Sequence, residues 1–141
     1  MPDLIARASI TVGVRVQKVW EALTTPETIK RYMFGTTVTS DWKEGSPITW
    51  KGEWQGKKYE DKGVITQLKP PQILQYTHFS PLAGLADQPE NYHTVTIELS
   101  ADGNRTLVDL SQDKNETEEA RAHSTKNWEK MLAGLKRVVE E

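Results

Sequence analysis

The sequence contains no cysteine in its 141 residues. This absence excludes a disulfide framework, a thiol nucleophile and a zinc site built on cysteine. No stretch approaches the roughly 20 consecutive apolar residues that a membrane helix needs, so we expect no membrane insertion. The first four residues, Met1-Pro2-Asp3-Leu4, lack the basic segment and the apolar run of a signal peptide. We therefore expect a cytoplasmic protein.

Several sequence signatures of chemistry are absent as well. The chain has no GxSxG nucleophile elbow, no HExxH motif and no glycine-rich loop ahead of a helix. The formal net charge is -2 and the basic residues are scattered, so nothing indicates a nucleic-acid partner. We expect no bound metal and no cofactor.

What the sequence does have is the composition of a folded domain. Hydrophobic residues make up 36% of the chain and charged residues 27%, with five tryptophans. These values are typical of a globular chain and not of a disordered one. The length is enough to bury one core without disulfides. We expect a single domain over residues 1–141.

The first quarter of the chain predicts a strand followed by two short helices. Residues 5–12 alternate loosely between apolar and polar side chains, as a half-buried strand does. Residues 16–23 place their apolar side chains at helical spacing. Thr25 and Pro26 are typical of the N-cap and first residue of a second helix, with Ile29 and Tyr32 facing inward.

The middle of the chain, from about residue 38 to residue 112, has the pattern of antiparallel strands. Trp50 and Trp54 share one face of a strand, and residues 55–58 fit a hairpin turn. Pro70-Pro71 ends the strand that follows, because proline has no N–H to donate. Further strands are predicted at 73–79, 92–99 and 106–112, with a long loop at 81–89 and a turn at 102–104.

The C-terminal segment predicts the longest helix. Asn115 is the expected N-cap, with Glu118 three residues later as in a capping box. Its apolar stripe consists of Ala120, Ser124, Trp128, Met131, Leu132, Leu135, Val138 and Val139. Helices and strands segregate along the chain, which favours an α+β fold. We predict a curved antiparallel sheet wrapped around this helix, with a small-molecule cavity between them.

Four segments together resemble a known family. They are residues 16–32 (VQKVWEALTTPETIKRY), Trp42-Lys43-Glu44-Gly45, the strand 63–71 that ends in the double proline, and the tail 128–139. Their order and spacing are similar to those of the SRPBCC superfamily of START and Bet v 1-like domains. The branch they most resemble is the one named after the activator of Hsp90 ATPase. Relatives often carry two Trp or Trp-Phe where this chain has Tyr32-Met33-Phe34.

The resemblance implies a helix-grip fold, in which a seven-stranded antiparallel sheet grips the last helix. It also implies an elongated cavity for apolar ligands such as lipids, sterols or polyketides. We expect a small apolar or amphipathic ligand there. The residues expected to line the cavity are Trp20, Trp50, Trp54, Tyr76, His78, Trp128, Met131 and Leu135. The alternative for each of these side chains is that it packs in the core.

Acid–base chemistry in the cavity is a second hypothesis. A carboxyl group buried in an apolar pocket can act as a general acid or base in a cyclase or isomerase. The candidates are His78, Glu53, Glu60, Asp61 and Asp109, of which His78 and Asp109 come first. Strand positions such as these are more often solvated. The sequence therefore favours a binding protein over an enzyme and assigns no catalytic residue.

The remaining histidines and the long loop leave alternatives open. His78 and His93 are expected to face each other across a hairpin, and His123 lies on the last helix. No spacing among them indicates a metal site. The apolar loop between Ser80 and Asn91 fits either a lid over a pocket mouth or a docked surface loop.

A third hypothesis is a protein-interaction role, because the family name implies contact with an Hsp90-type chaperone. The eukaryotic activators carry an additional N-terminal domain that these 141 residues do not contain. An exposed apolar patch rimmed by charge would favour such a partner.

Overall fold

The computed structural model describes residues 4–81 and 84–141, except for the side chain of Trp54. Seven antiparallel strands form one sheet in the order β1-β7-β6-β5-β4-β3-β2. The strands are β1 (Leu4–Val12), β2 (Thr37–Ser40), β3 (Pro47–Trp54), β4 (Lys57–Lys69), β5 (Ile73–His78), β6 (His93–Asp102) and β7 (Arg105–Asn115). The helices are α1 (Val16–Thr24), α2 (Pro26–Tyr32), the 3-10 turn η2 (Pro89–Asn91) and α3 (Glu118–Val139).

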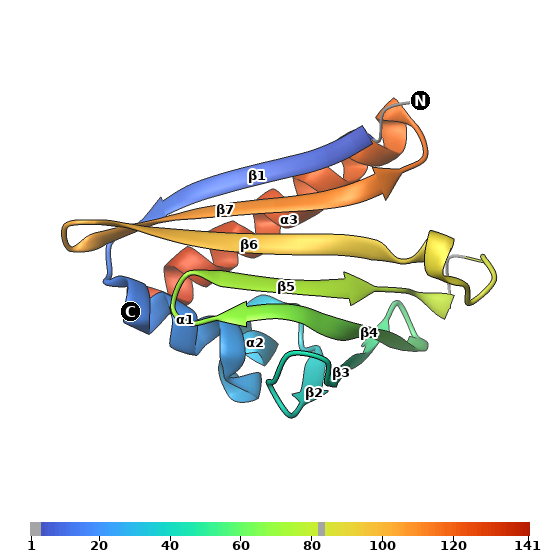
Figure 1. Ribbon diagram of the computed structural model, residues 1–141, viewed down its shortest axis with the longest axis horizontal. Coiled ribbons are helices and arrows are strands. Elements are labelled where there is room, and N and C mark those ends of the chain that lie inside the picture. Colours follow the sequence, from blue (N-terminus) through green and yellow to red (C-terminus); the bar gives the residue numbers. More distant parts are fainter. Residues whose placement is uncertain (1–3, 82–83) are drawn as a thin grey trace.

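The helices lie on one face of the sheet (Figure 1). The long α3 crosses behind β7 and β6 and packs chiefly against β1, while α1 and α2 lie at one end of the sheet (Figure 1). Gly134 of α3 comes so close to Tyr32 of α2 that a Cβ atom there would lie 3.3 Å from the tyrosine Cβ. Tyr32 itself is buried and donates its hydroxyl to the carbonyl of Ala22 at 2.8 Å. This is the helix-grip arrangement, and it confirms the predicted fold class.

The core lies between α3 and the concave face of the sheet. Alternate residues of each strand point toward the helix, as the pleat requires. The C-terminal half of α3 closes this space completely: Leu132 and Leu135 are 1% and 0% exposed. The N-terminal half of the helix does not, because Trp128 remains only half-buried. The core is therefore filled at one end of the molecule and hollow at the other.

The turns agree with the sequence pattern, whereas the cap of α3 does not. Gln55 and Gly56 both have positive φ and join β3 to β4 directly, as expected for a two-residue hairpin. Asn115, the expected cap, is instead the last residue of β7. Thr117 is the N-cap, and its side chain accepts a hydrogen bond from the N–H of Ala120. The prediction for Asn115 was wrong because β7 continues three residues further than the apolar pattern does.

Within the described residues, no helix combines the length and the apolar character that crossing a bilayer requires.

Candidate ligand pocket

A pocket of about 470 Å³ opens at the hollow end of the core. Its walls come from eight parts of the chain: the segment after α2, the strands β3 to β7, the segment between β5 and β6, and α3. The side chains that surround it are mostly apolar. The lining residues are Met33, Phe34, Thr36, Trp50, Glu53, Tyr59, Asp61, Tyr76, His78, Phe79, Ser80, Leu85, Asn91, His93, Gln112 and Trp128.

Three aromatic side chains form the inner wall. Trp50 of β3 lies between Tyr76 and His78 of β5, with ring centroids 5.0 Å and 4.9 Å away. The rings are tilted by 57° and 64°, which is the edge-to-face geometry that aromatic pairs favour. Tyr76 and His78 are two residues apart on one strand and so share its inner face. Trp50 and Tyr76 are buried, whereas His78 is half-buried.

His78 pairs with a carboxylate on the neighbouring strand. Its Nε2 lies 2.9 Å from Oδ2 of Asp61, and the Asp61 side chain is only 15% exposed. Asp61 stands opposite Trp50 in the β3–β4 register, which directs it toward the same wall. The other carboxylate oxygen, Oδ1, is buried and has no hydrogen-bond partner. An imidazole and a carboxylate thus meet inside an otherwise apolar pocket.

A glycine makes room for Tyr59 in the side wall. Gly52 of β3 pairs with Tyr59 of β4, and a Cβ atom at Gly52 would overlap the tyrosine hydroxyl. That hydroxyl lies 2.5 Å from Oγ1 of Thr36, in a hydrogen bond between the two side chains. The absence of a side chain at Gly52 therefore lets Tyr59 lie flat along the wall.

The far wall is fixed by polar contacts between α3, β7 and β6. Trp128 donates its indole N–H to Oε1 of Gln112 at 2.5 Å, so the largest side chain of the helix is held at one angle. His93 lies directly opposite His78 in the β5–β6 register, as expected. Its Nδ1 forms a hydrogen bond of 2.9 Å with the backbone carbonyl of Asp113.

The rim of the pocket carries exposed apolar side chains. Phe34 is 67% exposed and Leu85 is 44% exposed, and both border the opening. Phe34 has a φ of 57°, an uncommon conformation for a bulky residue. This backbone conformation places the ring at the rim, where most of its surface is exposed.

The loop beside the rim is attached to β4 by polar contacts. Asp87 forms an ion pair with Lys62 and accepts a hydrogen bond from the hydroxyl of Tyr92 at 2.6 Å. Lys62, and after it Tyr92, hold the pKa of the Asp87 carboxyl below its ordinary value. Tyr92 also stacks on Phe79 with ring centroids 5.0 Å apart. These contacts describe a docked loop, and whether it opens as a lid stays a hypothesis.

The structure distributes seven of the eight expected cavity residues among three environments. Trp50, Tyr76, His78 and Trp128 border the pocket. Met131 borders a small void of about 30 Å³ deeper in the core. Trp20 and Leu135 pack in the core away from the pocket, and the side chain of Trp54 lies outside the described part. Their role toward a ligand stays a prediction.

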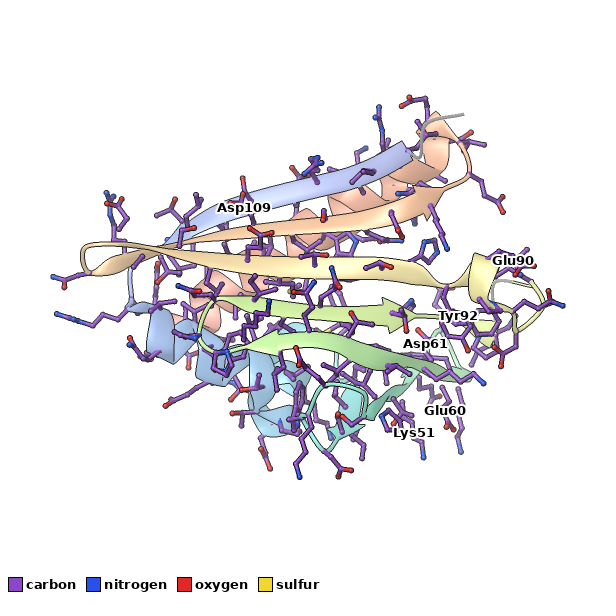
Figure 2. All side chains as sticks on the ribbon, viewed as in Figure 1. Lys51, Glu60, Asp61, Glu90, Tyr92 and Asp109 are labelled. Carbon is purple, nitrogen blue, oxygen red and sulfur yellow. The ribbon has the colours of Figure 1, made fainter. Side chains whose placement is uncertain are left out.

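The acidic candidates separate by strand face. Asp61 points inward, whereas Glu60 is exposed and lies near Lys51 on the outer face, with a nitrogen-to-oxygen distance of 3.9 Å. Asp109, expected to be one of the first acid–base candidates, is exposed and lies far from Asp61 on the sheet (Figure 2). Asp109 was therefore wrong as a cavity residue, because β7 presents its odd-numbered positions outward.

Sequence reasoning missed several residues that border the pocket: Met33, Phe34, Thr36, Tyr59 and Gln112. Tyr59 carried a usable signal, because it shares the parity of Asp61 and Ile65 on one strand. Met33 and Phe34 lie where the sequence departs from the family pattern, which was the one signal for them. Thr36 carried none, since its position depends on a turn and not on a periodic pattern. Within residues 4–81 and 84–141, no three histidine, aspartate or glutamate side chains are grouped to hold a metal ion.

Comparison with solved structures places this architecture among known proteins. The solution structure of ChR145 from Cytophaga hutchinsonii is 58% identical, covers 99% of this chain and 97% of its own, and superposes with a TM-score of 0.87. The Aha1 dimer from Colwellia psychrerythraea is 22% identical over 96% of both chains, with a TM-score of 0.75.

A further similar structure is DynU16, a protein in the dynemicin biosynthetic locus. It is 18% identical with a TM-score of 0.81, and this chain spans 48% of its length. At this identity the likeness shows the fold alone. No curated protein matches the chain.

The family model described as activator of Hsp90 ATPase homolog 1-like protein matches residues 14–140. That match begins two residues before α1 and ends one residue after α3, and so includes every element that lines the pocket. The chain belongs to the activator of Hsp90 ATPase homolog 1-like family, as its sequence resemblance indicated.

Proposed function

We propose that the protein binds a small apolar or amphipathic molecule in the pocket between the sheet and α3. The observation that carries this proposal is the aromatic wall of Trp50, Tyr76 and Trp128 around a hollow of about 470 Å³. Ligand sites in proteins are typically concave, mostly apolar and within this range of volumes. Interiors without such a role are close-packed, with few voids larger than a water molecule.

The energy available from such a pocket is sufficient for useful affinity. A ligand that loses about 300 Å² of apolar surface to the walls gains about 7 kcal/mol from the hydrophobic effect. Association costs at least about 4 kcal/mol of translational and rotational freedom. The exposed Phe34 and Leu85 at the rim extend the apolar contact beyond the walls. The difference of about 3 kcal/mol corresponds to about millimolar affinity for simple apolar probes, and we expect higher affinity for a ligand that fills the pocket.

The alternatives receive less support. A chaperone-type protein partner would need an exposed apolar patch. Among the described residues, the exposed Phe34 and Leu85 border the pocket, whereas the exposed Val64 and Leu107 lie apart on β4 and β7. An enzyme would need acid–base groups at the pocket, and of the candidates His78, Asp61 and Glu53 border it whereas Asp109 does not. These groups alone do not indicate a reaction, so the apolar lining remains the main support for binding. The location of DynU16 in a biosynthetic locus is in keeping with a small-molecule role for this fold.

Native mass spectrometry of the freshly purified protein tests the proposal, combined with organic extraction of whatever accompanies it. We expect a discrete bound mass, or uptake of one from a panel of fatty acids and polycyclic aromatics. Ser80→Trp places a bulky ring among the lining residues and should abolish uptake. Ser100→Trp makes the same change at an exposed position of β6 and should not. Uptake by neither the wild type nor Ser100→Trp would count against the binding role.

A further inference from the structure

Hydrogen-bond direction determines what His78 presents to the pocket. A carboxylate can only accept hydrogen bonds, so the contact between Asp61 Oδ2 and Nε2 of His78, at 2.9 Å, requires the proton on Nε2. In the neutral imidazole the lone pair then lies on Nδ1. Nδ1 has no hydrogen-bond partner among the described residues. The neutral His78 therefore has an acceptor at Nδ1 that no described residue uses, on a side chain that borders the pocket.

Asp61 holds His78 in this state. Its Oδ1 is buried without a partner, and Nε2 of His78 is the one hydrogen-bond donor to its side chain in the described part of the chain. Reversing the imidazole tautomer would leave both carboxylate oxygens unpaired in a site that is largely shielded from water. An unpaired buried acceptor costs about 1–3 kcal/mol, which favours the tautomer with the proton on Nε2.

Tyr76 supplies the complementary group. It lies two residues before His78 on the same face of β5 and borders the same pocket. Burial raises the pKa of the Tyr76 hydroxyl well above its ordinary value, so the group stays a neutral O–H donor. Its oxygen has no hydrogen-bond partner among the described residues. An acceptor and a donor thus belong to two side chains on the same face of β5 that border the same pocket.

We propose that this site selects apolar ligands that carry a hydroxyl group, with the hydroxyl proton donated to Nδ1 of His78 and the oxygen accepting from Tyr76. The proposal rests on the binding role proposed above and names its ligand class: phenols and alcohols on an apolar body. An isosteric ligand without a donor displaces water from Nδ1 and leaves that nitrogen unpaired. The discrimination follows from this loss.

Isothermal titration calorimetry with three matched probes tests the proposal. 2-Naphthol donates a hydrogen bond, 2-methoxynaphthalene only accepts one, and naphthalene does neither. We expect 2-naphthol to bind about tenfold more tightly than the other two, the difference that one hydrogen bond produces. If apolar partitioning alone determined affinity, naphthalene would bind more tightly than 2-naphthol. The order of the two affinities therefore distinguishes hydrogen bonding from apolar partitioning.

The variants assign the preference to His78. His78→Phe should bind all three probes within about twofold of one another. If the single variant folds poorly, the double variant Asp61→Leu, His78→Phe provides the same comparison without an unpaired carboxylate. It should also bind the three probes with similar affinity. His123→Phe makes the same substitution at an exposed position of α3 and should keep the wild-type order.

Two results overturn the selectivity proposal while leaving the binding role intact. They are equal binding of the three probes to the wild type, and a tenfold preference that persists in His78→Phe and in the double variant. Absence of binding by all three probes would instead contradict the binding role, and the selectivity proposal with it.

Discussion

Gly52 determines how Tyr59 enters the wall of the pocket, because any side chain there overlaps the tyrosine hydroxyl. We predict that Gly52→Ala displaces Tyr59, breaks its hydrogen bond to Thr36 and lowers the free energy of unfolding by about 1–2 kcal/mol. Urea denaturation followed by tryptophan fluorescence measures the change.

A double-mutant cycle separates this clash from the intrinsic effect of the alanine. In a Tyr59→Ala background the same Gly52→Ala change should cost little, because the overlapping atoms are gone. An equal loss in both backgrounds would show that Tyr59 is not what Gly52 accommodates.

Single residues were only partly predictable from the sequence. Strand alternation places Trp50, Tyr76 and His78 on the inner face, where the structure has them. It does not say how far along the core each residue lies. Leu135, for example, was expected to line the cavity because it is apolar and faces inward, but it is fully buried in the core. Depth along the core depends on the angle between helix and sheet, which no local pattern encodes.

At the scale of elements, the junction between β7 and α3 combines a helix cap with a buried polar residue. Thr117 caps α3 through Ala120. Asn115 donates to the carbonyls of Leu4 and Gln112 at 2.9 Å and 3.1 Å and accepts from Ser124 at 3.0 Å. It therefore ties the end of β7 to both β1 and α3.

We predict different losses of stability for two alanine substitutions at this junction. Thr117→Ala should lower the free energy of unfolding by about 1 kcal/mol, the usual value of a threonine cap. Asn115→Ala should cost more, about 2–3 kcal/mol, because it leaves buried carbonyls without a donor. Thermal and urea unfolding of the two variants measure the order. A larger loss for Thr117→Ala would contradict this assignment of roles.

The elements themselves were largely predictable. Hydrophobic period and turn residues identified the two short helices, the hairpin at Gln55-Gly56 and the strand that ends at Pro70. The error at Asn115 has a physical reason. Lys114 adopts a φ of 56°, which turns the chain so that Asn115 points into the core. Asparagine has the same polar groups whether it caps a helix or is buried, so the residue type does not distinguish the two roles.

At the scale of the whole molecule, two exposed carboxylates attach the C-terminal end of the chain. Glu140 accepts from Lys136 and from the N–H of Gly13 at 2.6 Å, and Glu141 accepts from Arg31 at 2.6 Å and 2.7 Å. These hydrogen bonds hold the pKa of each carboxyl below its ordinary value. The largest contribution comes from Lys136 for Glu140 and from Arg31 for Glu141. Together they connect the end of α3 to α2 and to the segment after β1.

We predict that these contacts make stability depend on pH in the acidic range. A carboxyl whose pKa is lowered by folding contributes its full stabilisation above its unfolded pKa, here about 4.5, and loses it as pH falls through the folded value. The urea concentration at the midpoint of unfolding should therefore decrease as the pH is lowered below about 4.5. The effect should be modest and weaker in 0.5 M salt, because the groups are exposed.

The double variant Glu140→Gln, Glu141→Gln is the matched control. Its urea midpoint should lie closer to that of the wild type at pH 3 than at pH 7. A gap that is unchanged across this range would show that the terminal carboxylates do not contribute through their charge.

The overall architecture was predictable because consecutive strands from β2 to β7 simply follow one another across the sheet. The pairing of β1 with β7 was not predicted, because no local signal joins segments about 100 residues apart. The hollow end of the core was also beyond the sequence pattern. It lies beside the N-terminal half of α3, where Gln112 holds the indole ring of Trp128.

The most direct test of the central claim is a titration of the isotope-labelled protein with naphthalene, followed by ¹H–¹⁵N NMR. We predict saturable shifts that are largest for the indole N–H of Trp128 and the backbone of Trp50 and Tyr76, with nuclear Overhauser effects from the ligand to the methyl group of Met33. Shifts confined to the outer face of the sheet around Asp109, or no saturable shifts, would contradict a ligand site between the sheet and α3.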